Sequence, residues 1–167
     1  AATGRRVGTY MSPEGTVNER IRIDGHPIDD ESLADAVLSV RGVAELLGLE
    51  LTAFEAVTLA SLVAFADAPV DVAIIEVGLL GRFDATNIVD GDVAVVTSVG
   101  ADHTDFRDGW LDRVASEKAG IIKARSQAVL GDIDDALIAH FESEGPESLV
   151  RLGREFACTE DRVALGG

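Results

Sequence analysis

Two nearly continuous apolar runs, each of strand length, constrain the fold of this chain more than any other feature. Residues 70–77 read Val-Asp-Val-Ala-Ile-Ile-Glu-Val, and residues 92–99 read Asp-Val-Ala-Val-Val-Thr-Ser-Val. Strands that are apolar on both faces are typical of a parallel sheet that helices cover on both sides. Because the runs alternate with helical segments, the sequence predicts an α/β fold: a doubly wound, mostly parallel sheet with helices on both faces.

Helix start and stop signals predict several further elements. Asp30 is the expected N-cap of a helix over 31–47, which should end at Gly48. Thr52 begins the next helix, and Glu55 three positions later completes a capping box. The remaining pattern predicts strands at 5–10, 127–131, 155–158 and 162–165, an extended piece at 20–23, and helices at 110–122 and 133–143.

The charge balance bears on the partners of the protein. Thirty acidic residues against fourteen basic ones give a net charge of −16. A field of that sign repels phosphate backbones, which argues against nucleic acid as a partner. It also repels small phosphorylated ligands unless a divalent cation or a local basic cluster inverts the field. The simpler interpretation of the charge is a solvated acidic surface.

Cysteine use and the longest apolar stretch bear on the cellular compartment. The single cysteine, Cys158, excludes an internal disulfide and fits a reducing compartment, so we expect a cytoplasmic protein. Asp67, Pro69 and Asp71 interrupt the apolar stretch at 56–75, which predicts a helix, a turn and a strand instead of a membrane span. Because the chain begins at Ala1 without an initiator methionine, we expect a fragment or a processed product.

Polar residues follow both apolar runs, at the edge where open parallel sheets bind their ligands. Glu76 closes the first run, and Asp102-His103-Thr104 follows the second. A carboxylate and an imidazole at this edge are able to hold a divalent cation that bridges nucleotide phosphates. A hydrogen bond between Glu76 and His103 is the alternative. Lys118 lies on the next predicted helix, where the pattern alone indicates a surface charge.

Several short segments occur in an order that is specific to one enzyme family. Residues 76–87 read EVGLLGRFDATN, residues 102–104 read DHT, and residues 117–123 read EKAGIIK. Residues 52–55 read TAFE, and residues 12–13 read SP. In this order and spacing, the segments resemble the motifs EVGLGGRLDATN, DHT, EKAGIIK, T-x-F-E and SPHL of the folylpolyglutamate synthase and dihydrofolate synthase family, within the Mur ligase superfamily.

The resemblance implies roles for individual residues. Ser12, Glu76 and His103 would be Mg²⁺ ligands, and Lys118 would be the lysine that is carbamylated in this family. A carbamylated lysine is carboxylate-like and holds a second Mg²⁺. The resemblance also implies a pterin site. For Phe54, which lies on a predicted helix, packing in the helix core remains an alternative. The residues lining that site would be Thr52, Ala53, Phe54, Glu55, Phe83, Asp84 and Ala85.

The family implies an ATP- and Mg²⁺-dependent ligase that adds L-glutamate to dihydropteroate or folate through an acyl phosphate. Its partners would be these small molecules, with no nucleic acid and no membrane, and the full-length protein would be a monomer. Residues 1–167 would form one partial central domain, with closing strands at about 146–167. A GxxGK[ST] phosphate-binding loop is absent from the sequence, so we do not expect this chain alone to be a competent ligase.

Three departures from the family pattern bear on substrate choice. Glu14 replaces the histidine of SPHL, Leu80 replaces the second glycine of GLGG, and residues 107–110 replace LG-x-T. Two other hypotheses therefore stay open: another Mur-type amide ligase with a different acceptor, and a non-catalytic relic that binds a pterin or a partner. We also expect an exposed sheet edge in this chain, with weak stability or self-association.

Overall fold

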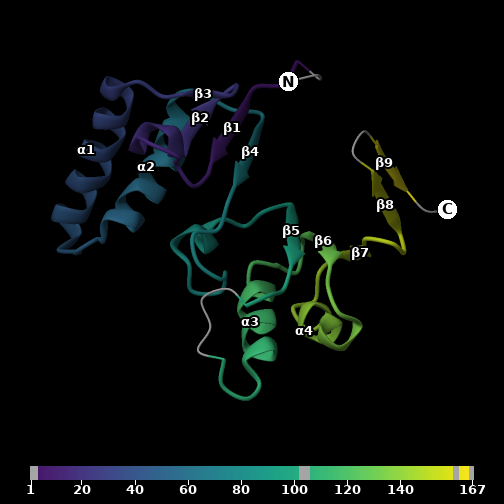
Figure 1. The fold of residues 1–167 in the computed structure, drawn as a ribbon. Helices are drawn as coiled ribbons and strands as arrows, with labels where there is room; N and C mark the ends of the chain where they lie inside the picture. Colours follow the sequence, from purple (N-terminus) through teal and green to yellow (C-terminus); the bar gives the residue numbers. More distant parts are fainter. Residues whose placement is uncertain (1–3, 102–105, 160–161, 166–167) are drawn as a thin grey trace. The chain divides into compact units, whose positions relative to one another are not determined.

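Two separate hydrophobic cores divide the chain into two units, residues 1–78 and residues 79–167. The computed structural model describes residues 4–101, 106–159 and 162–165 (Figure 1). His103, a predicted metal ligand, lies outside the described residues. Across the described ranges, no helix is both long enough and apolar enough to span a membrane.

The first unit contains a four-stranded sheet that combines parallel and antiparallel pairing. The strand order is β3-β2-β1-β4, formed by β1 (Val7–Tyr10), β2 (Ile21–Ile23), β3 (His26–Pro27) and β4 (Val72–Ile75) (Figure 1). β1 and β4 are parallel, with Tyr10 opposite Ile75, whereas β1–β2 and β2–β3 are antiparallel. The carboxyl ends of β1 and β4 therefore lie together.

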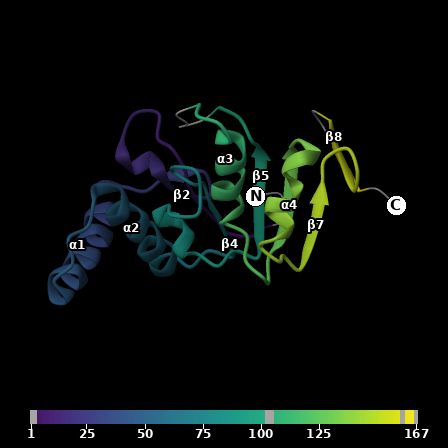
Figure 2. The same ribbon diagram turned by 90° about the horizontal axis from the view of Figure 1, so that it is seen from below.

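α2 (Ala53–Asp67) packs against this sheet, α1 (Asp30–Leu47) packs against α2, and the two helices supply most of the core of the first unit. α1 and α2 lie side by side (Figure 2), and the short 3₁₀ helix η1 (Val17–Arg20) precedes β2. Phe65 of α2 packs in a core with the buried Tyr10 and Ile21. The Tyr10 hydroxyl and the Thr58 hydroxyl form a buried hydrogen bond of 2.9 Å, which satisfies both polar groups.

The caps of α1 and α2 follow from local side-chain chemistry. The N-cap of α1 is Asp29 and not Asp30, because the Asp29 carboxylate accepts the Ser32 N–H at 2.8 Å. Gly48 ends α1 in the left-handed conformation, with φ 66°, as its lack of a Cβ allows. Thr52 is the N-cap of α2, as predicted.

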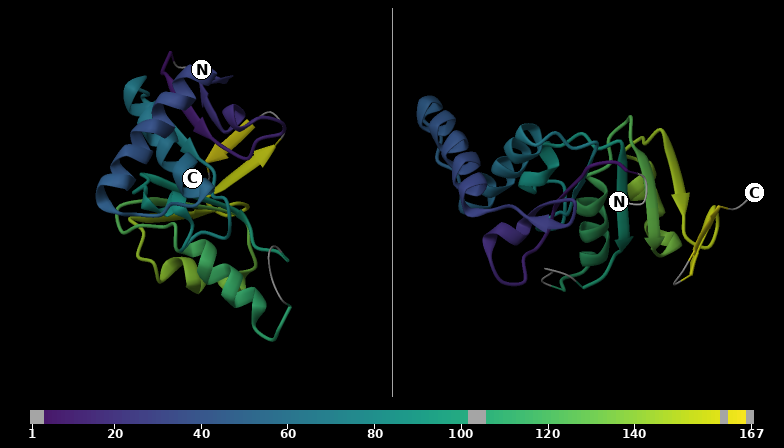
Figure 3. Two further views of the ribbon diagram at one scale, coloured as in Figure 1. Left: turned by 90° about the vertical axis from the view of Figure 1, so that its left-hand side faces the viewer. Right: turned by 90° about the horizontal axis from the view of Figure 1, so that it is seen from above.

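The second unit contains a three-stranded parallel sheet, in the order β5-β6-β7. α3 and α4 lie on the same side of these strands (Figure 3, left). A separate antiparallel pair, β8–β9, follows. The elements are η2 (Ala85–Ile88), β5 (Val93–Ser98), α3 (Trp110–Ala119), β6 (Gln127–Asp132), η3 (Asp135–Leu137), α4 (Ile138–Glu142), β7 (Ser148–Arg151), β8 (Phe156–Thr159) and β9 (Arg162–Leu165).

The two faces of β5 differ in burial. Ala94 and Val96 point into the core beneath α3 and α4, and each is at most 5% exposed. Val93 and Val95 alternate with them on the opposite face and are each 54% exposed. The apolar run that predicted β5 therefore gives one well-buried face and one half-exposed apolar face.

The α/β class and its parallel pairing are confirmed, while several element boundaries differ. The apolar run at 70–77 contributes only Val72–Ile75 to a strand. The helix predicted at 133–143 is split, because the Asp134 carboxylate accepts the Ala136 N–H and starts a 3₁₀ turn ahead of α4. β7 falls within the range of about 146–167 in which closing strands were expected, although its own bounds were not predicted, since its four residues Ser-Leu-Val-Arg are too few for a clear alternation.

Candidate functional site

Ser12 and Glu76 lie together at the carboxyl ends of β1 and β4. The Glu76 N–H donates to the Tyr10 carbonyl at 2.8 Å, which continues the parallel ladder by one residue. The Ser12 N–H then donates to Oε2 of the Glu76 carboxylate at 2.6 Å. Glu76 is exposed, so its carboxylate is accessible to a ligand. The structure thus brings two predicted metal ligands to one edge of the sheet.

The oxygen chemistry of this pair fits a magnesium ion in part. Carboxylate and hydroxyl oxygens are the hard ligands that Mg²⁺ prefers, and Mg²⁺ commonly binds through one or two protein groups, with waters and phosphates completing its shell. Among the described residues, no group of three or more His, Cys, Asp or Glu side chains is placed to hold a metal. Ser12 and Glu76 would therefore supply only part of the ligands of a metal ion.

The loop that follows Ser12 is held by Glu19. The Glu19 carboxylate accepts the backbone N–H groups of Glu14 and Gly15 at 3.1 Å each and that of Thr16 at 3.3 Å. These bonds, the one from Thr16 first, lower the pKa of Glu19. Glu14, the acid that replaces the family histidine, is thus anchored through its backbone, and its side chain is exposed.

Thr52 and Glu55 form the capping box that the sequence predicts. The Thr52 N–H and hydroxyl both donate to Oε2 of Glu55 at 2.7 Å, and the Glu55 N–H donates to the Thr52 hydroxyl at 3.2 Å. The Thr52 hydroxyl is the main cause of a lowered Glu55 pKa. Both residues therefore stabilise the start of α2, whatever else they bind. Ala53 is exposed beside them.

Phe54 packs partly into the core of the first unit. Its ring lies 6.4 Å from the Tyr10 ring, centroid to centroid, and the Arg20 guanidinium lies 5.7 Å from the Phe54 ring centroid. Because the side chain is only half-buried, part of it remains available to a ligand. The helix-core interpretation of Phe54 thus accounts for one side of the ring.

Asp84 organises the loop that precedes η2. Its Oδ2 accepts the Leu79 N–H at 2.8 Å, and its Oδ1 accepts the Thr86 N–H at 2.9 Å and the Thr86 hydroxyl at 2.6 Å. A carboxylate has about four acceptor positions, so these contacts use most of its capacity. Phe83, by contrast, is 86% exposed, and Ala85 is half-buried.

The residue that replaces a family glycine in this loop has a left-handed backbone. Leu80 has a φ of 58°, a region that a Cβ disfavours by about 1–2 kcal/mol. The bonds from Asp84 on either side hold the loop in this conformation. Leucine thus occupies a backbone conformation that favours glycine.

Lys118 lies half-buried in the last turn of α3, directly against the loop of Asp84. A Cβ placed on Gly81 would lie only 3.3 Å from the Lys118 Cα and 2.8 Å from the Glu117 carbonyl oxygen. The structure therefore brings the predicted lysine and the predicted pterin residues at 83–85 onto adjoining backbone segments of the second unit.

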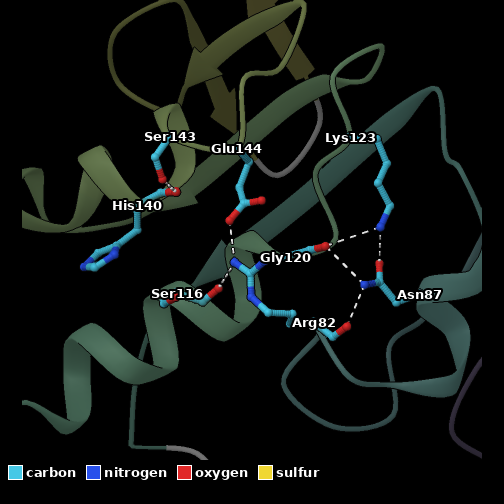
Figure 4. A network of polar contacts seen from close by, with 8 residues as sticks. All are labelled: Arg82, Asn87, Ser116, Gly120, Lys123, His140, Ser143 and Glu144. Carbon is cyan, nitrogen blue, oxygen red and sulfur yellow. Dashed lines mark hydrogen bonds and ion pairs between the residues drawn. The ribbon is translucent and has the colours of Figure 1, made fainter.

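A network of polar contacts surrounds this junction (Figure 4), and sequence analysis did not predict it. Arg82 forms an ion pair with Glu144 and also donates to the Ser116 carbonyl at 2.8 Å. The Asn87 amide donates to the Arg82 carbonyl at 2.8 Å and accepts from Lys123 Nζ at 2.9 Å. Arg82, Asn87 and Lys123 all fall within the motifs at 76–87 and 117–123, and that was the available signal.

The chain matches a model of the Mur ligase middle domain over residues 30–160. It is 41% identical over 161 residues to a dihydrofolate synthase/folylpolyglutamate synthase of Escherichia coli, covering 93% of this chain and 37% of that protein. The chain thus spans well under half of that relative.

Solved structures show the same likeness. An E. coli FolC in complex with DHPP and ADP matches with a TM-score of 0.85 and 36% identity, over 95% of this chain and 39% of that one. A bifunctional folylpolyglutamate synthase/dihydrofolate synthase of Yersinia pestis, complexed with AMPPNP and Mn ion, matches with a TM-score of 0.85 and 34% identity. The match covers 97% of this chain and 40% of that one. The chain belongs to the Mur ligase middle domain family and is related, within it, to the folylpolyglutamate and dihydrofolate synthases.

Proposed function

We propose that the full-length protein containing this chain is an ATP- and Mg²⁺-dependent amide ligase that adds L-glutamate to dihydropteroate or a folate. The observation that carries the proposal is the pairing of Ser12 with Glu76 at the ends of two parallel strands. It is supported by related structures that hold DHPP and ADP in one case and AMPPNP with Mn in another.

The reaction proceeds in two balanced steps. A carboxylate oxygen of the pterin substrate attacks the γ-phosphorus of ATP, and ADP leaves. The amine of L-glutamate then attacks the acyl carbon, phosphate leaves with the electron pair of the acyl–oxygen bond, and the nitrogen gives up a proton to solvent. Both steps develop negative charge on phosphate oxygens, and bound Mg²⁺ supplies the charge that neutralises it.

The residues of this chain bind and position the reactants in that scheme. Ser12, Glu76 and His103 would hold one Mg²⁺, and carbamylated Lys118 a second. Phe54 and Phe83 present exposed ring surface on which a pterin can stack. Thr52, Ala53, Glu55, Asp84 and Ala85 would line the same substrate. The substrates are small molecules, and we keep a cytoplasmic, monomeric protein as part of the proposal.

The deciding experiment is glutamate-dependent ADP release by the full-length protein, with dihydropteroate or tetrahydrofolate as acceptor. Glu76→Ala should abolish it, whereas Glu50→Ala, which removes an exposed acid of the same unit, should leave it unchanged. Activity with neither pterin, but with another carboxylate acceptor, would instead favour a different Mur-type ligase. Pterin binding without any ADP release would favour a non-catalytic protein.

A further inference from the structure

The end of α3 is capped by residues that lie far from it in the sequence. The last carbonyls of a helix lack intrahelical partners and carry partial negative charge, which cations stabilise. Here the Arg82 N–H donates to the Glu117 carbonyl at 2.9 Å, and the Arg82 guanidinium donates to the Ser116 carbonyl at 2.8 Å. Lys123 Nζ lies 3.5 Å from the Gly120 carbonyl. The two contacts of Arg82 join the loop at 79–88 to the C-terminal turn of α3.

Two glycines let this loop approach the helix backbone to backbone. A Cβ on Gly120 would lie 2.5 Å from the Arg82 Cβ and 2.8 Å from its Cα. A Cβ on Gly81 would meet the Glu117 carbonyl oxygen at 2.8 Å. All three distances are shorter than real Cβ atoms show, so both positions need glycine for this close approach. The Arg82 backbone is therefore in direct contact with the turn that carries Lys118.

Glu144 holds the Arg82 guanidinium from the other side. The two side chains form an ion pair and are 33% and 21% exposed, so both charges are largely withdrawn from water. The hydrogen bond to Glu144 raises the pKa of Arg82. Because Glu144 lies just beyond α4, Arg82 connects the loop to the ends of both helices (Figure 4).

Asn87 fastens the other end of the same loop. Its Nδ2 donates to the Arg82 carbonyl at 2.8 Å and to the Gly120 carbonyl at 3.2 Å, and its Oδ1 accepts from Lys123 Nζ at 2.9 Å. Arg82 and Asn87 therefore bracket residues 83–86 and fix both ends of that segment to α3 and the turn after it. These bonds restrict the movement of residues 83–86 relative to Lys118.

We propose that Arg82, held by Glu144, is a positioning residue that sets the placement of the loop at 83–85 relative to Lys118. This rests on the proposed function, in which the loop would bind the pterin substrate and carbamylated Lys118 would hold a Mg²⁺. Each site keeps its own local structure without Arg82, since Asp84 organises the loop and α3 has its own backbone hydrogen bonds. What the Arg82 side chain contributes, together with Asn87, is the alignment between the two sites.

The role predicts a specific kinetic signature. Misplacement of reactants by about 1 Å costs on the order of 10²-fold in rate. In the full-length protein, Arg82→Met should lower kcat by about that factor, while the equilibrium Kd values for dihydropteroate alone and for Mn²⁺–nucleotide alone change less than about threefold. Arg82→Lys keeps the positive charge but cannot contact Ser116 and Glu144 together. Its kcat should therefore lie between those of the unaltered protein and Arg82→Met.

Two further variants keep the test decisive. Glu144→Gln leaves Arg82 and a neutral acceptor in place, so it should fold and show a smaller loss of kcat with the same unchanged Kd values. Arg125→Met removes an exposed cation of the same unit and should leave kcat unchanged. Unchanged kcat in Arg82→Met and Glu144→Gln would overturn the positioning role. A fall in the affinity for either ligand that parallels the fall in kcat would overturn it as well. Lack of ligase activity in the unaltered protein would instead overturn the proposed function.

Discussion

The Ser12 backbone N–H donates to Oε2 of Glu76 at 2.6 Å, although 64 residues separate the two in sequence. The bond ties the loop after β1 to the end of β4 and orients the Glu76 carboxylate at the sheet edge. One carboxylate oxygen thus accepts a bond that stabilises the fold, and the side chain as a whole remains exposed.

Glu76→Gln separates these two roles. The amide oxygen of glutamine still accepts the Ser12 N–H, so the free energy of unfolding should change by less than about 1 kcal/mol. The loss of charge should weaken Mn²⁺ binding at least about tenfold, since hard divalent cations prefer carboxylates. Electron paramagnetic resonance titration with Mn²⁺, beside urea unfolding, measures both quantities. Equal Mn²⁺ affinity in the variant would exclude Glu76 as a ligand.

Leu80→Gly should cost the protein far less than the same change at its neighbour. Leu80 has a φ of 58°, so glycine relieves about 1–2 kcal/mol of backbone strain. This gain offsets the greater entropy that glycine loses on folding and the apolar contacts of the leucine side chain. Leu79→Gly has no such relief. Urea unfolding should find Leu80→Gly more stable than Leu79→Gly by about 1 kcal/mol or more. Equal losses would contradict strain at Leu80.

Thr52→Ala should lower the free energy of unfolding by about 1 kcal/mol, as for other lost N-caps. Thr52→Ser keeps the hydroxyl that bonds the Glu55 N–H and should restore most of the stability. Thermal or urea unfolding without ligand measures the effect. An unchanged stability of the alanine variant would refute a stabilising contribution of this cap.

Acid should weaken the loop that Glu19 holds. Its folded-state pKa lies below its unfolded value, so its contribution to stability is present above the ordinary glutamate pKa of about 4.3 and is lost as the pH falls through the folded pKa. Glu19→Gln removes this titration. Urea unfolding from about pH 7 to about pH 3 should therefore show a shallower acid loss in the variant than in the unaltered chain. If the stability of the variant and of the unaltered chain changed with pH in the same way, Glu19 would not contribute to the acid sensitivity.

The chain of 167 residues should self-associate through an exposed strand edge. In the described residues β4 and β5 each end their sheet, with Ile74 57% and Val95 54% exposed. A charge on an edge strand opposes pairing with a second copy. Val95→Lys should shift light-scattering mass toward the monomer, whereas Val43→Lys, at an exposed position of α1, should have no such effect. A monomeric unaltered chain would refute this expectation.

Local chemistry explains why much of the fold followed from the sequence. The capping box of Thr52 and Glu55, the stop at Gly48 and the apolar strand β5 depend on residues close together in the chain. The cap of α1 was misplaced by one residue, because adjacent Asp29 and Asp30 give the same signal. The grouping of 1–167 into one domain stays a prediction, as do the metal and pterin roles of the site residues.

The sequence by itself determined the α/β class, the main helices and strands, and the motifs that place this chain in its family, since these depend on local patterns of a few residues. Only the tertiary structure decided which distant groups meet: the Ser12 amide with the Glu76 carboxylate, and Arg82 with Ser116 and Glu144. Such pairs depend on strand register and on the backbone contact that Gly81 and Gly120 allow. No local pattern specifies them, because the partners come together only when the sheets and helices have packed.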